Sequence, residues 1–327
     1  MNILILSAGT RNKVVQYFKW ELGETGMVLA TDCSGLAPAV YEADQFFLVP
    51  RISAPDYLDR VLDICKRERV DGVFSLIDPE LSLLARERER FLEVGATPIV
   101  SPYELVETCL DKYRMYQLLC EMGIPTGRCY VDREEFYRAV EEGLISYPVF
   151  VKPVRGSASM NINMVRSREE LEVLFHLYDD LMIQEYMDGT EYGADVYVDM
   201  LSGRCTSLFV KEKLRMRAGE TDKSVSVRDD RLFGLIENFV ETCGFCGMID
   251  IDIFRIEDTY YISEVNPRFG GGYPHAYECG VNFPAQVLRN LKGESNPPSI
   301  GGYQTGICMM KYNEVTVMDM KNMEMVR

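Results

Sequence analysis

Features of membrane, secreted and nucleic-acid-binding proteins are scarce in this sequence. No uninterrupted apolar run approaches the ~18 residues that a membrane-spanning helix needs. Residues 1–6 are too short for a signal peptide and lack its basic start, so they indicate a first strand. The 35 Lys and Arg residues face 51 Asp and Glu, and the net charge of −16 disfavours nucleic acid or an anionic membrane as a partner. We therefore expect a soluble, cytoplasmic protein that acts on small molecules.

Signatures of metal and redox sites built on histidine or cysteine are also scarce. His176 and His275 are the only histidines, and the ten cysteines are scattered through apolar segments, as is typical of reduced cytosolic thiols. Cys243 and Cys246 form a single CxxC without a second pair. This isolation favours a structural role at a helix end over zinc or redox chemistry.

Two common nucleotide-binding loops are missing as well. The pattern GxxxxGK[ST], which marks the phosphate-binding loop of many NTPases, does not occur. The segment at residues 7–10 (SAGT) lies between an expected strand and helix and could hold an anion, but it is not a full GxGxxG. An NAD-dependent oxidoreductase stays an alternative, and it predicts nicotinamide binding.

What is present is the composition of a globular protein, with 47% hydrophobic and 26% charged residues over 327 positions. That length allows two or three packed lobes. Expected strands and helices alternate in the first hundred residues, with strands at 2–7, 28–32 and 72–77 and helices at 13–22, 57–67 and 79–94. This alternation predicts a doubly wound parallel sheet. Asp32 and Asp78, at expected strand ends, are ordinary loop acids or face a substrate pocket.

The stretch 247–273 (GMIDIDIFRIEDTYYISEVNPRFGGGY) predicts a β-hairpin with an acidic turn, followed by a glycine-rich loop. If the two strands pair, Asp252 can lie beside Glu264 and Asn266, which share one face. Two carboxylates and an amide oxygen are hard donors that suit Mg²⁺. Arg268 would then place a fork-shaped cation beside the metal, where a phosphoryl group would sit. The alternative is a solvent-facing hairpin whose acids only aid solubility.

Two further segments carry lysines in a suggestive setting. Residues 147–153 (YPVFVKP) predict a strand with Lys152 pointing inward, followed by the small-residue loop 155–159 that could wrap a polyphosphate. Residues 210–218 (VKEKLRMRA) place Lys211, Lys213 and two arginines at period two on one strand face. That basic face indicates either a charge-protected edge strand or contact with a γ-phosphate or anionic substrate.

The remaining chain predicts helices and late strands. Ser101 and Glu104 have capping-box spacing and open an expected helix that runs to Met122. A helix is expected at 287–291, and late strands at 305–312 and 315–317.

Taken together, these motifs resemble the ATP-grasp superfamily, and within it the carbamoyl-phosphate-synthase-like branch. There, E-x-N-P-R follows an acid or Gln on the preceding strand, and Asp252, Glu264, Asn266 and Arg268 fall on those positions. The resemblance is close over about residues 104–292 and looser before them. It implies a Rossmann-like pre-ATP-grasp domain at 1–104 and a two-lobed ATP-grasp domain at 105–303. The lid lobe would span about 112–186, the metal-binding lobe about 187–303, and C-terminal strands would follow at 304–327.

The resemblance also implies ATP and Mg²⁺ (or Mn²⁺) as cofactors and assigns site residues. The metal ligands would be Asp252, Glu264 and Asn266, and the catalytic residues Arg268 and Lys152. The nucleotide would contact Lys112, Lys152, Gly156, Ser157, Gln184, Glu185, Tyr186, Met187, Glu191 and Lys211. The loop at 155–159 has one glycine where many members of the superfamily have two or three.

The implied activity is that of an ADP-forming ligase, in which ATP activates a carboxylate, bicarbonate or carbamate and an amine then attacks. The sequence has no second ATP-grasp copy and no glutaminase nucleophile context, so a complete carbamoyl-phosphate synthase is not expected. The alternative is a non-catalytic ATP-binding regulatory or scaffold module. The acid, the amine and a homodimeric state stay open, and His275 is a candidate for substrate contact.

Overall fold

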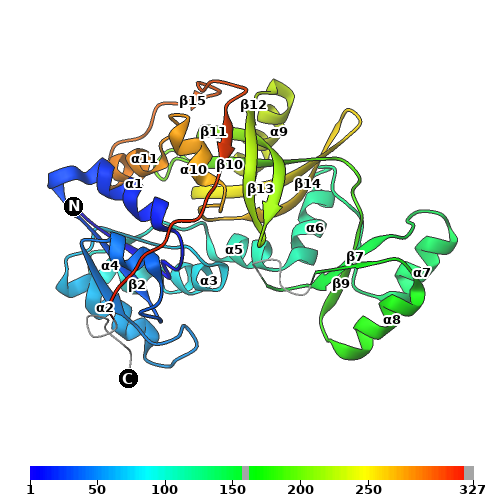
Figure 1. Cartoon of the computed structure of the whole chain (residues 1–327), viewed down its shortest axis with the longest axis horizontal. Coiled ribbons are helices and arrows are strands. Elements are labelled where there is room, and N and C mark those ends of the chain that lie inside the picture. Colours follow the sequence, from blue (N-terminus) through cyan, green and yellow to red (C-terminus); the bar gives the residue numbers. More distant parts are fainter. Residues whose placement is uncertain (157–161, 320–327) are drawn as a thin grey trace.

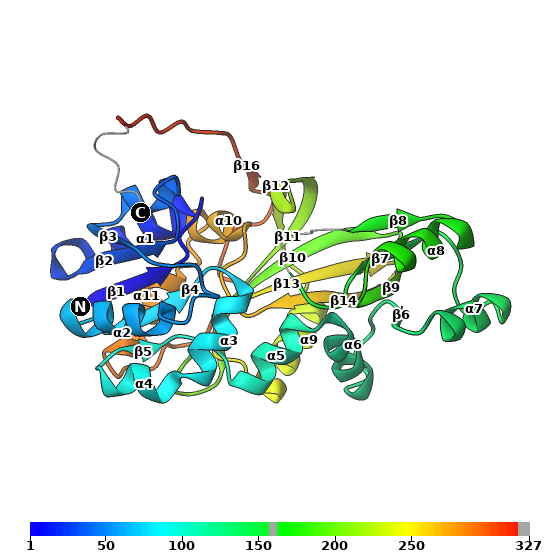
Figure 2. The ribbon, with the colours of Figure 1, turned by 90° about the horizontal axis from the view of Figure 1, so that it is seen from below.

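The computed structural model describes residues 1–156 and 162–319, and three β-sheets follow one another along its longest axis (Figures 1 and 2). The first sheet has the parallel order β3-β2-β1-β4-β5. Its strands are β1 (Asn2–Leu6), β2 (Met27–Asp32), β3 (Gln45–Leu48), β4 (Gly72–Ser75) and β5 (Thr97–Pro98). Its helices are α1 (Asn12–Leu22), α2 (Tyr57–Arg67), α3 (Asp78–Arg86) and α4 (Arg88–Glu93). The predicted doubly wound sheet is confirmed.

This sheet is buried on both faces, as the continuous apolar run of β1 predicts. Ile3 and Ile5 pack into one core cluster, while Leu4 and Leu6 pack into another on the opposite face. The chain leaves β1 toward β2 on one side, and β4 pairs with β1 on the other. The crevice at the carboxyl ends of β1 and β4 is therefore the topological switch point, where open α/β sheets bind ligands.

Three local predictions in this region are wrong. The expected helix 79–94 breaks at Glu87 into α3 and α4. Ser101 does not cap a helix, because its Oγ instead accepts from Cys246 N–H (3.0 Å) and donates to Cys246 O (3.1 Å), tying the first lobe to a distant loop. The long helix expected up to Met122 is two helices, α5 (Tyr103–Leu110) and α6 (Lys112–Glu121), because Asp111 takes an extended conformation and caps α6 by accepting from Arg114 N–H.

The small lobe lies at the far end of the molecule from the first lobe, and its sheet has the order β6-β9-β7-β8 (Figure 2). It has its own apolar core between the sheet and two helices. Its strands are β6 (Cys129–Tyr130), β7 (Val149–Pro153), β8 (Asn163–Val165) and β9 (Leu181–Glu185), and its helices are α7 (Arg133–Glu141) and α8 (Arg168–Leu177).

The central sheet has the order β14-β13-β10-β11-β12-β16, with β15 beside β11. Its strands are β10 (Thr190–Val198), β11 (Cys205–Arg217), β12 (Glu220–Val227), β13 (Gly247–Ile256), β14 (Thr259–Asn266), β15 (Ser299–Ile300) and β16 (Cys308–Met310). Helices α9 (Asp230–Cys243), α10 (Tyr273–Glu278) and α11 (Phe283–Leu291) accompany it. The edge-strand alternative for residues 210–218 is wrong for 210–212, which pair with both β10 and β12, whereas 213–217 pair with β12 alone among the described strands.

After β16 the chain forms no further regular element within the described residues, so the expected strand 315–317 is wrong. Val315 and Val317 are 84% and 87% exposed, and neither belongs to a strand in the described part of the chain. Residues 320–327 lie outside the described part. None of the helices in the described residues is long and apolar enough to span a membrane. We propose that the boundary of the first lobe lies near residue 104, at the start of α5.

Candidate active site

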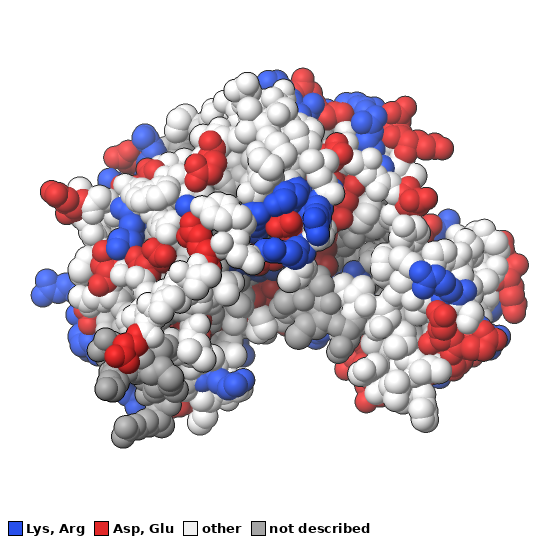
Figure 3. Space-filling model, viewed as in Figure 1, with Lys and Arg blue, Asp and Glu red and all other residues white. Residues whose placement is uncertain are grey.

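A cavity of about 330 Å³ lies between the first lobe, the small lobe and the central sheet, and all three contribute to its walls. Figure 3 shows the molecule hollowed between the small lobe and the rest. The first lobe provides Arg11 and Asp78, and the small lobe provides Phe150, Lys152 and Gln184. The central sheet provides most of the remaining wall, including Glu191, Glu220, Asp250, Asp252, Glu264, Asn266 and Arg268.

The β13–β14 hairpin brings the predicted oxygen donors together. The predicted pairing is confirmed: Asp252 lies opposite Glu264, and Asp250 lies opposite Asn266. The alternating isoleucines of β13 face the core, so the intervening acids face the cavity. The hairpin thus presents three carboxylates and one amide oxygen to the same space.

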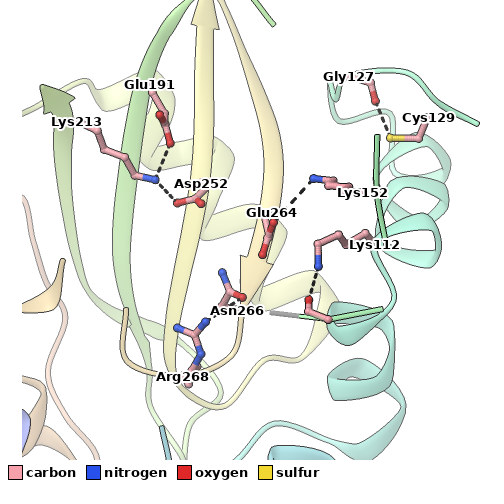
Figure 4. A network of polar contacts seen from close by, with 11 residues as sticks. Lys112, Gly127, Cys129, Lys152, Glu191, Lys213, Asp252, Glu264, Asn266 and Arg268 are labelled. Atoms are coloured by element: carbon pink, nitrogen blue, oxygen red, sulfur yellow. Dashed lines mark hydrogen bonds and ion pairs between the residues drawn. The ribbon is translucent and has the colours of Figure 1, made fainter. Parts of the chain in front are cut away.

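Two of these carboxylates, Asp252 and Glu264, already lie beside lysine side chains. Lys213 Nζ donates to Asp252 Oδ1 (2.6 Å) and to Glu191 Oε1 (2.8 Å), and Lys152 Nζ lies 4.0 Å from Glu264 (Figure 4). Burial would lower the pKa of Lys213, but Asp252 and Glu191 outweigh it and raise that pKa. Among the described residues no three His, Cys, Asp or Glu side chains form a metal-binding group. Two carboxylates and an amide fit Mg²⁺, which commonly completes its shell with waters and substrate phosphates.

Arg268 is held by an acid from the first lobe. Its Nε lies 2.9 Å from Asp78 Oδ1, and its Nη2 donates to Asp78 Oδ2 (3.1 Å) and Asn266 Oδ1 (3.3 Å). Both side chains are nearly buried, with 12% and 10% exposed. Burial would lower the pKa of Arg268, but Asp78 and Asp250 outweigh it and raise that pKa. Asp78 is expected from the sequence to be either an ordinary loop acid or a residue that faces a pocket. It is the first residue of α3 and lies in the cavity wall.

The two predicted phosphate lysines approach the cavity from different elements. Lys112 begins α6, and its Nζ donates to Gly156 O at the start of the predicted loop (Figure 4). Lys152 lies on β7 and is 5% exposed. Burial lowers the pKa of Lys152, with partial compensation by Glu264. Ser157, the next predicted contact after Gly156, lies outside the described residues.

The predicted nucleotide contacts at residues 184–187 lie at the end of β9 and just after it. Gln184, Glu185 and Met187 line the cavity, whereas Tyr186 is 37% exposed and packs against Phe150 in a tilted arrangement, with ring centroids 5.6 Å apart. Glu185 Oε2 accepts from Arg128 N–H (2.9 Å), and the Glu185 N–H donates to Arg128 O (2.8 Å). These bonds fix the chain direction at the point where the small lobe joins the central sheet.

Lys211 does not line the cavity. It is 1% exposed, and its Nζ donates to Asp195 on the neighbouring strand β10. Lys213, two residues along the same strand, is the lysine that reaches the predicted metal ligand. The sequence of β11 alone could not separate the two, because the acids that hold them come from β10 and β13.

His275 also lies outside the cavity wall. It is 2% exposed, with Nδ1 2.8 Å from Ser224 Oγ, Nε2 3.1 Å from Ile307 O, and its ring edge-on to Phe209. Burial, assisted by the charge of Lys211, lowers the pKa of His275 to about 4. It therefore acts as a neutral packing residue in this conformation.

The glycines after Phe269 are explained by the charged side chains beneath them. A Cβ on Gly270 would overlap the Asp250 carboxyl group, and one on Gly272 would lie 2.6 Å from Lys211 Cε. A Cβ on Gly271 would lie 2.7 Å from the Glu220 carboxyl carbon and 2.8 Å from Arg11 Nη1. The loop needs these glycines for close approach, since none of the three has a positive φ.

Sequence reasoning gave no role to Asp250, Arg11, Glu220 or Phe150, all of which line the cavity. Asp250 could have been found, because it shares the face of Asp252 at period two. Burial, followed by the charges of Asp252 and Asp195, raises the pKa of Asp250. Arg11 and Glu220 are 209 positions apart, and no local pattern links them.

Comparison with known proteins defines the class. Residues 109–272 match the family described as "ATP-grasp domain", and residues 3–99 match "PylC-like, N-terminal domain". The chain belongs to the ATP-grasp family, whose enzymes use ATP and Mg²⁺, and the resemblance inferred from the motifs is confirmed.

Individual relatives are distant. The arginine-specific carbamoyl phosphate synthase large chain of Geobacillus stearothermophilus is 23% identical over 79% of this chain, but the match covers only 26% of that protein. The formate-dependent phosphoribosylglycinamide formyltransferase of Pectobacterium carotovorum is 23% identical over 75% of this chain and 67% of its own length. Among solved structures, the biotin carboxylase domain of Hydrogenobacter thermophilus 2-oxoglutarate carboxylase, with MgADP, ADP and bicarbonate, has a TM-score of 0.76 at 18% identity. It covers 94% of this chain and 73% of the other, and this likeness concerns the fold.

Proposed function

We propose that this protein is an ADP-forming ligase that uses MgATP to activate a carboxylate, bicarbonate or carbamate for attack by an amine. One observation carries the proposal: Asp252, Glu264, Asn266 and Arg268 face one cavity together with Lys152. Oxygen donors for a divalent cation and fixed positive charges beside them are what phosphoryl transfer requires. The ATP-grasp membership and the MgADP and bicarbonate of the fold relative support it.

In this proposal the nucleotide lies between the small lobe and the central sheet. Lys112 and Lys152 neutralise its phosphates, and the backbone of Glu185 and Met187 contacts the purine edge. Glu191 accepts hydrogen bonds from the ribose hydroxyls at the lone pairs that its bond from Lys213 leaves available. Gln184 and Gly156 complete the nucleotide contacts. We assign the lysine beside the metal ligands as Lys213 in place of Lys211, because Lys211 is buried against Asp195.

Asp252, Glu264 and Asn266 would hold Mg²⁺. When bound, the metal supplies charge neutralisation for the phosphate oxygens. Lys213 forms an ion pair with Asp252, and Lys152 lies near Glu264. The oxygens of these two carboxylates therefore already point toward positive charge, in the space that a metal cation would take.

The chemistry then needs positioning more than covalent participation by the protein. A carboxylate oxygen attacks the γ-phosphorus, the bond to the β,γ-bridging oxygen breaks, and ADP leaves. The amine nitrogen attacks the carbonyl carbon, the acyl C–O bond breaks, and phosphate leaves as the nitrogen loses a proton. Arg268, fixed by Asp78, stabilises the charge on the transferred group. Asp78 thus orients Arg268 without touching the substrate.

The test is a screen of carboxylic acids and bicarbonate with MgATP and hydroxylamine. We expect one class of acid to give a hydroxamate together with ADP and phosphate in equal amounts. Arg268→Ala should suppress hydroxamate formation far more than it weakens ATP binding. AMP and pyrophosphate as products, or phosphate release without a trappable acyl group for any acid, would contradict the proposal and favour an ATP-binding module without ligase activity. Molecular mass in solution tests the homodimer that the sequence left open.

A further inference from the structure

A second group of charges lies on the first-lobe side of the cavity, and the ligase chemistry above does not use it. It joins Arg11, Glu220 and Lys311, which are far apart in the sequence. Arg11 Nη1 lies 2.5 Å from Glu220 Oε1, and Lys311 Nζ lies 3.0 Å from Glu220 Oε2. Lys311 also donates to Gly271 O (2.6 Å), at the glycine-rich loop.

The three residues come from three separate parts of the fold. Arg11 precedes α1 at the carboxyl end of β1, so it sits at the switch point of the first sheet. Glu220 begins β12, directly after the tight turn at Ala218 and Gly219, both of which have positive φ. Lys311 follows β16 and is held by main-chain contact with Asp222. Arg11 and Glu220 line the cavity itself.

The rim around this group is basic, although the whole chain carries a net charge of −16. Arg215 and Arg217 lie near the end of β11, and Lys223 lies on β12 beside Asp222. Lys and Arg side chains gather at the middle of the face in Figure 3, around a small acidic centre. A local positive field in an acidic protein attracts anions to the cavity mouth.

The carboxylate of Glu220 occupies the place where such an anion would bind. Arg11 and Lys311 both contact it, and burial would raise its pKa, but these two cations outweigh burial and lower the pKa of Glu220. A carboxylate that is already neutralised by two cations is a poor partner for an ammonium group. The Glu220 side chain is 35% exposed, so a rotation about its own bonds can move it into solvent.

We propose that Arg11 and Lys311 form an anion subsite for the second substrate, and that Glu220 occupies this subsite until a carboxylate or phosphate of that substrate displaces it. The inference rests on the proposed ligase function, because it assumes that the amine enters this cavity. It narrows the amine to one that carries an anionic group, such as an amino acid or a phosphorylated amine.

The experiment titrates the purified full chain with two probes, inorganic phosphate and acetate. Removing the competing carboxylate in Glu220→Gln should tighten binding of at least one probe tenfold or more, within the range of a charge-assisted hydrogen bond. The double variant Arg11→Gln/Glu220→Gln should return to the wild-type affinity, which separates this subsite from phosphate binding near Lys152. The matched control is Glu294→Gln, which removes an exposed glutamate paired with Arg289 at 3.3 Å and should change nothing.

The probe whose affinity rises more in Glu220→Gln identifies the anionic group of the second substrate. A larger rise for phosphate indicates a phosphorylated amine, and a larger rise for acetate indicates an amino acid. A Glu220→Gln protein that is folded by circular dichroism yet binds both probes as weakly as wild type would overturn the proposal. A gain that survives the loss of Arg11 would overturn it as well. If Glu220→Gln does not fold, Glu220→Asp, which retracts the carboxylate by one methylene, must give a smaller gain in the same direction.

A separate titration with MgADP judges the proposed function independently. If MgADP does not bind while Glu220→Gln gains affinity for the probes, the ligase function fails and the anion subsite stands. If MgADP binds and the probes show no gain, the anion subsite fails while the nucleotide binding that the ligase function requires stands.

Discussion

The β13–β14 and β11–β12 hairpins belong to one sheet and both carry charged residues at alternate positions, yet they use their charges differently. In β13–β14 the acids pair across the hairpin in the register expected from the sequence, and they face the cavity. In β11–β12 the register shifts twice, between Lys213 and Arg215 and between Arg215 and Met216. In β11, the buried side chains of Lys211 and Lys213 are paired with acids from other strands, whereas the Arg217 side chain is 51% exposed.

The difference shows what determines whether a charged side chain in a strand is buried or exposed. Period-two alternation determines the face on which a residue lies. Whether a lysine on that face is buried depends on an opposite charge from a neighbouring strand, because an unpaired buried charge is costly. Asp195 on β10 and Asp252 on β13 supply those charges, and neither belongs to the β11–β12 hairpin.

The largest expected effect comes from breaking the buried pair of the β11–β12 hairpin. Lys211→Met would leave Asp195 buried without its partner, and we expect a loss of about 3–5 kcal/mol in the free energy of unfolding. The double variant Lys211→Met/Asp195→Leu should recover most of it. Arg217→Met, an exposed site on the same strand, should stay within about 0.5 kcal/mol of wild type. Denaturant unfolding measures all three, and an equal loss at residues 211 and 217 would contradict the comparison.

The matching change in the β13–β14 hairpin should leave stability intact and remove activity. Glu264→Gln keeps the shape of the side chain but takes away a charge from the proposed metal site, so we expect ADP release to fall by about 10²–10³-fold. Glu257→Gln, in the exposed turn of the same hairpin, is the control and should release ADP at the wild-type rate. Normal ADP release by Glu264→Gln would mean that this hairpin does not hold the metal.

A smaller effect is expected at the lysines that face the hairpin. Lys152→Ala and Lys112→Ala each remove a cation from the nucleotide phosphates, and each should cost about 1.5–3 kcal/mol, or ten- to a hundredfold, in ATP affinity or rate. Lys66→Ala, exposed on α2, should have no effect. Similar small changes in all three variants would count against the assignment of the nucleotide site.

The smallest effect, when counted per pH unit, concerns His275 behind β11 and β12. Its pKa is lowered to about 4, so between pH 6.5 and 4 the unfolded chain binds a proton that the folded protein excludes. Folding stability should therefore fall as the pH drops through this interval, and His275 should contribute at most about 1.4 kcal/mol per pH unit. His275→Gln should remove that part of the slope. An identical pH dependence in the variant would show that His275 is not held neutral.

Much of the fold follows from local sequence. A strand buried on both faces has a continuous apolar run, and the run in β1 therefore predicts the doubly wound sheet. A strand buried on one face alternates apolar and polar residues, and this alternation in β13 predicts the hairpin. The E-x-N-P-R motif, together with the acid Asp252 on the preceding strand, likewise led to four residues that line the cavity. Periodicity and turn chemistry act within a few residues, so features that depend only on them can be predicted.

Features that depend on contacts between distant segments could not be predicted. Asp111 lies within a helix-like pattern, but it forms a β-bridge with Arg155, and its extended conformation ends α5. The alternating residues 315–317 resemble a strand, yet they pair with no strand among the described residues. The pairing of Arg11 with Glu220 joins two lobes, and the burial of Lys211 depends on Asp195. In each case the partner is set by the tertiary fold.

The most direct test of the account follows the oxygen atoms of the acid substrate. An acid that supports ADP release is supplied with ¹⁸O in its carboxylate, together with MgATP and the amine. If the cavity beside the β13–β14 hairpin promotes acyl phosphate formation, one ¹⁸O atom should appear in each phosphate released, because the acyl C–O bond breaks when the amine attacks. If product forms but the released phosphate carries no ¹⁸O from the acid, the reaction does not pass through an acyl phosphate and the proposed function is contradicted.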